Sequence, residues 1–361
     1  MRIILHLKKI DWSLTAIAVA LSLIGLVSIY SSSNGDFLNF EKQAIFLVIG
    51  VFLMILASFF DYRILRENPY LILVIYLLCI LALVGLFFFA PEIRGTRSWY
   101  KIGPVSLDPI EFTKIALIII LAKYFSMRHV EMYRFWHVAF SGIYVSFPVF
   151  LAFLQPNLGS ALILVLIWVS TLFISGINFK HFLILAFLFV VLFTSSWFFF
   201  LEDYQKDRIV SFVFPEENFL EGSWNQAQSE IAIGSGGMWG KGIGEGTQAK
   251  NKFLPEPQTD FIFAVIAEET GLFGVLILIS LYGVFITRLI KLSVSFSTNF
   301  PRLLFVGFAA SVSSQLLINV GMNLGLLPVI GLPLPFVSYG GSGLISLFLG
   351  LGILQGAKVH G

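Results

Sequence analysis

Long apolar runs, separated by short polar segments, are the dominant pattern along this chain. Each run is close to the length of about 20 residues that an α-helix needs to cross a bilayer at a rise of about 1.5 Å per residue. The pattern therefore predicts an all-α polytopic membrane protein with about ten transmembrane helices. The predicted spans are residues 12–31, 43–60, 69–90, 111–127, 136–154, 159–177, 181–201, 261–287, 302–327 and 341–357.

The composition supports this topology. Of the 361 residues, 57% are hydrophobic and only 12% are charged, which is about half the charged fraction of a soluble domain. We expect a single transmembrane domain over residues 1–361, with a large loop at about 202–260 between the seventh and eighth spans. No nucleic-acid partner is expected.

Lysine and arginine residues indicate the orientation. If the N-terminus is cytoplasmic, most of them fall in short cytoplasmic segments, as the positive-inside rule requires. The C-terminus is then cytoplasmic as well, and the long polar segments at 91–110 and 202–260 face outside. A cleaved signal peptide is the alternative for the N-terminus, but the first run exceeds the usual apolar core of about 7–15 residues, so we favour a retained helix.

Histidine and cysteine are placed away from the predicted outer face. The single cysteine, Cys79, lies inside a span, and the histidines all lie at predicted cytoplasmic ends. An outer site must therefore use carboxylates, amides, hydroxyls, Arg and Lys. The histidines are His6, His129, His137, His181 and His360.

The first polar outer segment combines cations with aromatic residues. Arg94, Arg97 and Lys101 surround a Trp–Tyr pair and could hold a phosphate group at the membrane surface. An ordinary interfacial belt explains them equally well. Glu111 and Lys114 lie three residues apart on one helical face just inside a span, where unpaired charges are costly. We expect an ion pair there, with substrate contact as the alternative.

The large outer loop is rich in glycine. High glycine density lets backbone N–H groups approach an anion or a sugar closely, while a flexible hinge is the alternative. A nucleotide-binding P-loop is excluded, because Gly242 rather than Ser or Thr follows Lys241 and the loop faces away from cytoplasmic ATP. The candidate substrate contacts in this loop are Arg208, Gln228, Ser229, Ser235 and Lys241.

Asp260 stands where the large loop re-enters the bilayer. As a helix N-cap it would accept backbone N–H groups. As a carboxylate at the lipid–water boundary it would have a raised pKa and be a stronger base. The residues alone leave both interpretations open. Glu268 and Glu269 follow about two turns deeper in the predicted span, where carboxylates are functional candidates or pair within the bundle.

Three amides recur every four residues in the ninth predicted span, at Gln315, Asn319 and Asn323. They share one helical face, which must contact protein or a polar cavity. We favour interhelical contact, with substrate binding at Asn319 as the alternative. The Pro- and Gly-rich run at 327–342 cannot be a regular helix and is interpreted as an ordered outer loop. Its candidate substrate contacts are Ser338 and Tyr339.

Together these segments resemble the RodA/FtsW/SpoVE (SEDS) family of cell-wall glycan polymerases, with RodA the nearer likeness. Their order and spacing cover essentially the whole chain. The motifs are Lys42-Gln43, Gly95-x-Arg97-x-Trp99, Glu111/Lys114, Gln155-Pro-x-Leu-Gly, Ile233-Gly-Ser-Gly-Gly, Phe253-Leu-Pro-Glu with Thr259-Asp-Phe-Ile-Phe, and the run 325–342.

The resemblance implies polymerisation of lipid II into β(1→4) glycan strands on the outer face of a bacterial cytoplasmic membrane, with release of undecaprenyl pyrophosphate, in elongation and shape maintenance. Asp260 matches the family's essential aspartate, which implies a general base acting on the acceptor GlcNAc 4-hydroxyl in an inverting reaction. Arg97, Lys101, Lys114 and Arg208 are candidates for neutralising the pyrophosphate, with a divalent cation (Mg²⁺ or Mn²⁺) as an open question.

The resemblance also implies a partner, a class B penicillin-binding protein that acts as a transpeptidase, besides lipid II and membrane lipid. Two departures stand out. Gln258 stands where many relatives have His, so acid–base help from that position is in doubt. Asn157 stands where an aspartate is usual, which removes a charge that could support a metal or loop contact.

Two other functions remain as alternatives: a flippase for a lipid-linked sugar, and a non-catalytic scaffold of a cell-wall complex. Transporters usually place charged residues at the midplane between repeats. Here the polar groups gather at the predicted outer face, which favours a transferase.

Overall fold

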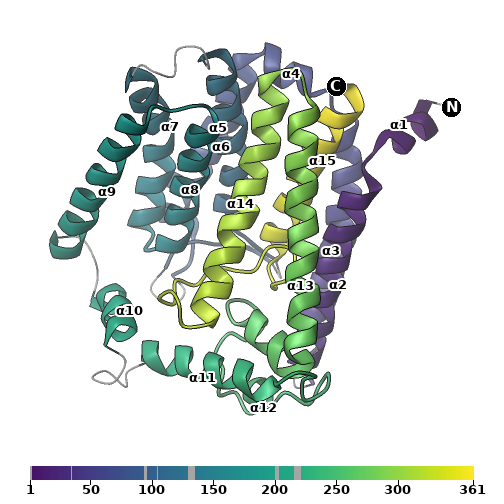
Figure 1. Ribbon diagram of the computed structural model, residues 1–361, viewed down its shortest axis with the longest axis vertical. Helices are drawn as coiled ribbons and strands as arrows, with labels where there is room; N and C mark the ends of the chain where they lie inside the picture. The colour runs from purple at the N-terminus through teal and green to yellow at the C-terminus, as the bar shows by residue number, and fades with distance from the viewer. Residues whose placement is uncertain are drawn as a thin grey trace.

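Ten helices of at least 17 residues run along one another in the described part of the chain and form the bundle in Figure 1. The structure is a computed structural model that describes residues 2–33, 35–92, 96–103, 105–128, 135–199, 203–214 and 221–361. The ten helices are α2 (Trp12–Ser31), α3 (Leu38–Ser58), α5 (Pro69–Phe89), α6 (Pro109–Arg128), α7 (Phe135–Leu154), α8 (Leu158–Ile174), α9 (Phe179–Phe199), α13 (Ile262–Ser295), α14 (Asn299–Asn323) and α15 (Gly341–His360).

Each of the ten predicted spans is one of these helices, so the predicted fold class is confirmed. Eight of them, within the described residues, are long and apolar enough to cross a membrane. The other two are α8, which is apolar but has 17 residues, and α6, which carries charged side chains at both ends. Most of α6 is buried inside the bundle, and Lys114 is buried with it, whereas Arg128 at the other end of the helix is exposed.

Shorter elements fill the connections. The predicted large loop contains three helices, α10 (Asp203–Val213), α11 (Glu221–Gly236) and α12 (Thr247–Lys250). An antiparallel hairpin of β1 (Tyr100–Ile102) and β2 (Val105–Leu107) precedes α6, with Tyr100 opposite Leu107. The remaining helices are α1 (Arg2–Lys9) and α4 (Tyr62–Glu67).

The two ends of the bundle differ in what they carry. Both chain termini lie at one end, at the top of Figure 1, which we call the termini end. Helices α11 and α12 lie at the opposite end, which we call the loop end. The candidate site residues of the large loop therefore gather at the end away from the termini.

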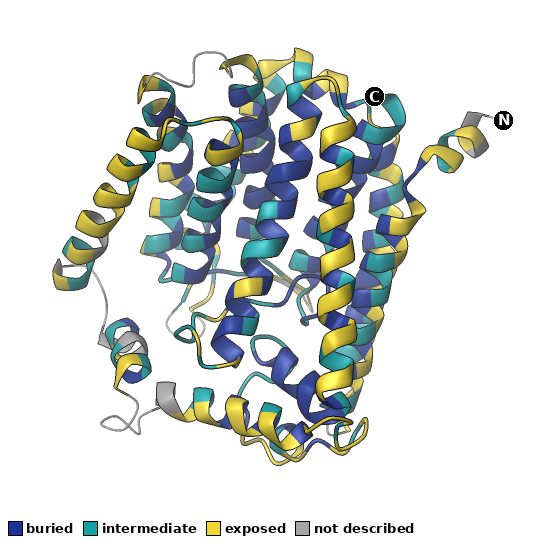
Figure 2. Cartoon of the chain, in the orientation of Figure 1, coloured by how far each residue is buried: buried dark blue, intermediate teal, exposed yellow. Residues whose placement is uncertain are grey.

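Helix α14 lies at the centre of the bundle. It packs against α6, α8 and α13, and it is the most buried of the eight apolar spans. Figure 2 shows its inner position, whereas α9 and the long part of α13 expose much of their surface. Exposed apolar residues on such helices are expected when lipid is the solvent.

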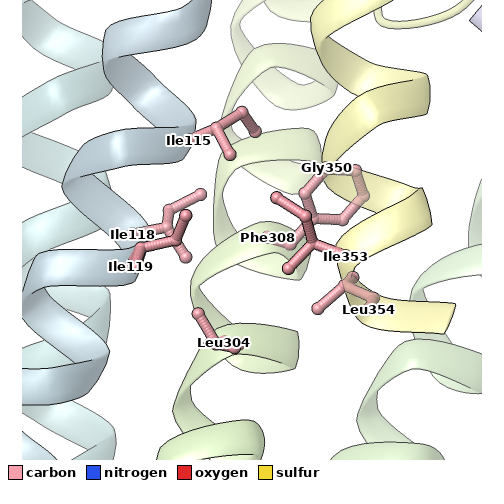
Figure 3. A pocket seen from close by; sticks show the side chains of 8 residues that line it. All are labelled: Ile115, Ile118, Ile119, Leu304, Phe308, Gly350, Ile353 and Leu354. Atoms are coloured by element: carbon pink, nitrogen blue, oxygen red, sulfur yellow. The ribbon is translucent and has the colours of Figure 1, made fainter. Parts of the chain in front are cut away.

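The interior between α6, α14 and α15 is closely packed. Figure 3 shows the eight apolar residues around a cavity of about 10 Å³, among them Ile118, Phe308 and Leu354. A cavity needs about 10–15 Å³ and polar partners to hold a water molecule, so this apolar space stays dry. It is a packing defect and no ligand site.

A kink divides α13 at Gly271. This glycine has φ 65° and ψ −165°, a backbone conformation that side-chain-bearing residues rarely adopt. A Cβ atom at Gly271 would lie 2.4 Å from the backbone nitrogen of Gly240, so the close approach of these two backbone segments requires glycine. The prediction of one continuous span from 261 to 287 is therefore wrong: a short helix precedes the kink, and the long helix begins after it.

Candidate active site

The carbonyl group of Asp260 is held by two amides of α14. Nδ2 of Asn319 donates to it over 2.9 Å and Nδ2 of Asn323 over 3.1 Å. Nδ2 of Asn319 also donates to the carbonyl of Leu332 over 2.7 Å, so both of its N–H bonds are used. Both amides are buried. Two of the three amides in the predicted stripe, Asn319 and Asn323, therefore tie two loops to the bundle and hold the main chain of the candidate base.

The loop between α14 and α15 holds the two residues before that aspartate. Oγ of Ser338 donates to the carbonyl of Thr259 over 2.5 Å and accepts from the N–H of Leu334 over 2.8 Å. The N–H of Tyr339 donates to the carbonyl of Gln258 over 2.8 Å. Ser338 and Tyr339, predicted as substrate contacts, therefore both position this turn, and the hydroxyl of Ser338 is occupied in doing so.

Gln258 joins the same turn to α2 and α3. Its Oε1 accepts from Nδ2 of Asn39 over 2.7 Å, and its Nε2 donates to the carbonyl of Ile29 over 3.5 Å. The link needs a donor and an acceptor on one side chain, and a neutral amide supplies both without titrating. The departure from His at this position thus has a structural use in this chain.

The carboxylate of Asp260 lies beside Gly331 of the α14–α15 loop. A Cβ atom on Gly331 would stand 3.3 Å from Oδ2 of Asp260, so a side chain there would press on the carboxylate. Helix α13 begins at Ile262 with Phe261 in the N-cap position and no side-chain cap. The N-cap interpretation of Asp260 is therefore wrong, and its main-chain carbonyl is held by the amides of Asn319 and Asn323.

A cavity of about 590 Å³ lies next to this turn. Its volume falls in the range of about 300–1,000 Å³ that small-molecule sites occupy. Hydroxyls, amides and charged groups line it together with a few apolar side chains, which suits a sugar. The residues that line it are Ser32, Ser33, Asp36, Asn39, Ala249, Lys252, Leu254, Pro255, Glu256, Pro257, Gln258, Thr259 and Tyr339.

Lys252 is a cation of this cavity that our sequence analysis missed. It is exposed, and with φ 56° it adopts a left-handed backbone conformation, as does Glu256 with φ 47°. Such strain is costly and tends to occur at functional sites. Only its place shortly before the Phe253-Leu-Pro-Glu motif could have pointed to it.

Glu111 and Lys114 form the predicted ion pair, with 2.7 Å between Oε2 and Nζ and little exposure of either side chain. Asp108 lies just before them, and its Oδ1 accepts from the N–H of Ile110 over 3.0 Å. Burial raises the pKa of Asp108 to about 8, and the neighbouring Glu111 acts in the same direction. The positive charge of Lys114 is therefore balanced by Glu111, while Asp108 is held mainly in its neutral form at pH 7.

The other predicted cations are only partly described. Arg97 pairs with Glu92 over 3.2 Å, and both side chains are about half exposed. Lys101 is exposed on β1. Arg94 lies outside the described residues, and so does the side chain of Arg208, whose backbone belongs to α10. No pyrophosphate clamp is assembled from these cations in the described part.

Glu268 and Lys241, both predicted as substrate contacts, bind each other over 2.7 Å. Glu268 is fully buried and also accepts from the N–H groups of Thr247 (2.9 Å) and Gln248 (3.2 Å). Its neighbour Glu269 bonds the hydroxyl of Ser31 at the end of α2. The prediction that both glutamates lie deep in a span is wrong, because the kink directly follows them and the large loop surrounds them.

The glycine-rich segment packs its backbone on that kink. The N–H groups of Lys241 and Gly242 donate to the carbonyls of Glu268 and Glu269, each over 3.0 Å. A Cβ atom at Gly240, where φ is 79°, would lie 2.1 Å from the carbonyl oxygen of Glu269. The glycines here permit close packing of two backbones, which accounts for them without a bound anion.

Of the three candidates on α11, Ser229 contacts the bundle, whereas Ser235 bonds within its own helix. Oγ of Ser229 donates to the carbonyl of Asn323 over 2.9 Å, and Oγ of Ser235 donates to the carbonyl of Ala232 over 2.9 Å. Gln228 is buried. All three lie in a helix rather than in an open loop, and the two hydroxyls are used within the protein. Their predicted contact with substrate stays a prediction.

The Gln155-Pro-x-Leu-Gly motif forms the turn between α7 and α8. Nε2 of Gln155 donates to the carbonyl of Leu83 over 2.9 Å. Asn157 is the N-cap of α8, and its Oδ1 accepts from the N–H of Ser160 over 3.1 Å. Asparagine and aspartate cap helices about equally well, so this departure leaves the turn intact. Across the described residues, no three His, Cys, Asp or Glu side chains gather as a preformed metal site.

Comparisons with known proteins agree over nearly the full length. The FtsW/RodA/SpoVE family of cell cycle proteins matches residues 11–361. The peptidoglycan glycosyltransferase MrdB of Escherichia coli K12 is 35% identical over 352 residues, which are 97% of this chain and 94% of MrdB.

Solved structures share the fold. A chain from a peptidoglycan synthase complex that coordinates polymerization and crosslinking has a TM-score of 0.83 at 30% identity, over 97% of both chains. The rod shape determining protein RodA of Thermus thermophilus has a TM-score of 0.72 at 29% identity, over 97% of this chain and 96% of that one. This chain is therefore a member of the FtsW/RodA/SpoVE family.

Proposed function

We propose that this chain is a peptidoglycan glycosyltransferase that polymerises lipid II into β(1→4) glycan strands and releases undecaprenyl pyrophosphate, in the service of cell elongation and shape. The observation that carries the proposal is the Asp260 turn, whose three consecutive carbonyls are each held by the bundle or its loops beside a polar cavity. Family membership supports the reaction class, since MrdB and FtsW relatives carry the name peptidoglycan glycosyltransferase.

Asp260 acts in this proposal as the general base. Its carboxylate takes the proton of the acceptor GlcNAc 4-hydroxyl while the oxygen attacks the anomeric carbon of the donor MurNAc. The new C–O bond forms on the face opposite the bond to the pyrophosphate, which breaks, and the configuration inverts. Holding the main chain of Asp260 through Asn319 and Asn323 orients the base before the substrate arrives, which lowers the entropic part of the barrier.

The pyrophosphate leaving group needs charge neutralisation more than protonation. Lys252 joins the earlier candidates Arg97, Lys101, Lys114 and Arg208 because it lines the cavity beside the turn. A requirement for Mg²⁺ or Mn²⁺ remains part of the proposal. The described carboxylates do not form a site for it, so we derive no step through a metal ion, and titration of the activity with each ion tests the requirement.

The loop end faces the outside of a bacterial cytoplasmic membrane in this proposal, and both termini are cytoplasmic. The bias of Lys and Arg toward the termini end supports this orientation. We further propose a class B penicillin-binding protein as partner. A similar chain belongs to a synthase complex in which polymerization and crosslinking are coordinated, which supports the pairing.

The decisive experiment compares Asp260→Asn and Asp260→Ala with the unchanged protein, each reconstituted in vesicles with lipid II. We expect strand formation to fall by about 10²- to 10⁴-fold, the usual contribution of a general base. Glu245→Gln, an exposed carboxylate of the same outer loop, is the matched control and should keep full activity. Unfolding temperatures confirm that the fold is intact. Full activity in both Asp260 variants would contradict the assignment.

The same preparation separates the alternative functions. Glycan polymer from lipid II supports the enzyme, translocation of a labelled lipid-linked sugar without polymer supports a flippase, and neither supports a scaffold.

Lys252→Ala tests the added cation. We expect kcat/KM for lipid II to fall about 10- to 100-fold, since a charge-assisted hydrogen bond contributes about 1.5–3 kcal/mol. Lys250→Ala is the control, because Lys250 pairs with Glu245 over 3.8 Å and does not line the cavity. Equal effects of the two substitutions would remove Lys252 from the proposed site.

A further inference from the structure

The loop between α11 and α12 carries a cluster of exposed apolar side chains. Met238, Trp239 and Ile243 are all more than half exposed, and Trp239 reaches 79%. Most of the indole surface of Trp239 is therefore not covered by the protein itself. Such exposed apolar surface indicates contact with something outside the chain.

The loop is bonded to the start of the long part of α13. The N–H of Leu272 donates to the carbonyl of Gly237 over 2.9 Å, and the N–H of Phe273 donates to the carbonyl of Met238 over 3.2 Å. The rings of Trp239 and Phe273 lie 5.8 Å apart. The apolar side chains are therefore held in place beside the helix.

That helix exposes an apolar stripe of its own. Leu272, Phe273, Leu276 and Ile277 begin the stripe directly after the kink. Because this segment is among the spans that are apolar enough to cross a membrane, its exposed side chains are expected in lipid. The loop cluster continues the stripe at the loop end of the bundle.

We propose that Met238, Trp239 and Ile243 form an anchor that enters the lipid–water interface on the loop side of the membrane. Tryptophan is enriched at the interface, where its ring lies at headgroup depth. Glu245 marks the part of the same loop that faces water, because it pairs with Lys250 of α12 and is largely exposed. Lipid is favoured over a protein partner because the cluster is continuous with a stripe that must meet the bilayer.

The anchor is tied to the helix that begins directly after Asp260. Through its N–H groups the same loop bonds the carbonyls of Glu268 and Glu269, the last part of that short helix. Insertion of Trp239 therefore sets the height of the short helix, and of Asp260 before it, relative to the headgroups. The effect of this height on strand formation rests on the proposed function, whereas the position of the anchor in the membrane does not.

Nitroxide labels at single cysteines test the anchor in the full chain, with Cys79→Ser as background, in vesicles of phosphatidylethanolamine and phosphatidylglycerol. Met238→Cys, Trp239→Cys and Ile243→Cys should collide more with oxygen, which concentrates in lipid, than with a water-soluble nickel chelate. Glu245→Cys is the matched control on the same loop and should show the reverse.

The proposal would be overturned if the labels at positions 238 and 243 were as accessible to water as the label at 245. The variants at 238 and 243 keep Trp239, so loss of the indole cannot be the cause of such a result. A surface that binds a protein partner instead of lipid would also be accessible to water in this experiment, because the vesicles contain this chain alone. The labels report depth without turnover, so a failure of the anchor and a failure of the proposed polymerase activity are distinguished.

Discussion

Two aspartates at opposite ends of the bundle each have their main chain held by a side-chain amide of another helix. At the termini end, Gln355 of α15 accepts from the N–H of Asp11 over 2.8 Å and donates to its carbonyl over 3.0 Å. At the loop end, Asn319 of α14 donates to the carbonyl of Asp260 over 2.9 Å. Each aspartate lies just before a long helical element, and each is tied by a buried amide of another helix.

The surroundings of the two carboxylates differ. Asp11 caps α2 through the N–H of Leu14 and bonds Arg288 at 2.9 Å and Lys358 at 3.0 Å. Burial opposes its charged form, but the hydrogen bonds from both cations outweigh this and lower the pKa of Asp11. Asp260 caps no helix, and its carboxylate lies beside a glycine. The carboxylate of the structural aspartate is thus held by a helix N-terminus and two cations, whereas the carboxylate of the proposed catalytic one lies at the α14–α15 loop beside Gly331.

Among changes that compare the two ends, exchanging the amides should have the largest effect on activity. Asn319→Asp replaces two N–H donors by a charged oxygen beside two carbonyls. We expect kcat for strand formation to fall about 10- to 100-fold, with a smaller change in KM, because misplacing a catalytic group by about 1 Å can cost 10²-fold. Gln355→Glu is the matched change at the other end and should affect the unfolding temperature instead. An equal loss of kcat in both variants would break the comparison.

Removing the structural carboxylate should affect stability alone. Asp11→Ala loses a helix cap and two charge-assisted hydrogen bonds, for which we expect a loss of about 2–3 kcal/mol in unfolding free energy. Because the folded pKa of Asp11 is lowered, this stability is present above the unfolded pKa and is lost as pH falls through the folded pKa. Unfolding in detergent at several pH values measures it, while kcat well below the unfolding temperature should not change.

Asp108→Asn should change the pH dependence of stability in the direction opposite to that expected at Asp11. The pKa of Asp108 is raised from 3.8 to about 8 in the folded protein, so the unfolded chain ionises first and stability falls as pH rises between these values. Asp108→Asn should reduce this loss, seen as a smaller difference in unfolding temperature between mildly acidic and alkaline buffer. Asp36→Asn, an exposed carboxylate, serves as control. An unchanged pH dependence in Asp108→Asn would show that the pKa of this carboxyl is not raised in the folded protein.

The sequence predicted the transmembrane helices well because one apolar run of sufficient length has one low-energy arrangement in a bilayer. It also predicted the Glu111–Lys114 pair, since residues three apart on a helix are neighbours whatever the surroundings. It failed at Gly271, where an apolar pattern continues through a kink that only contact with Gly240 reveals. Lys252 was missed because a lone loop lysine has no local signature.

The order of apolar and polar segments by itself determined a ten-helix membrane bundle with its chemistry in the segments around Asp260, because solvation by lipid depends on composition over each span. The tertiary structure alone decided what the polar residues do. Asn319, Ser338 and Glu268 could equally have met a ligand, but each is occupied by a partner distant in the chain. Hydrogen bonds are short and directional, so their partners are set by packing and cannot be predicted from neighbouring residues.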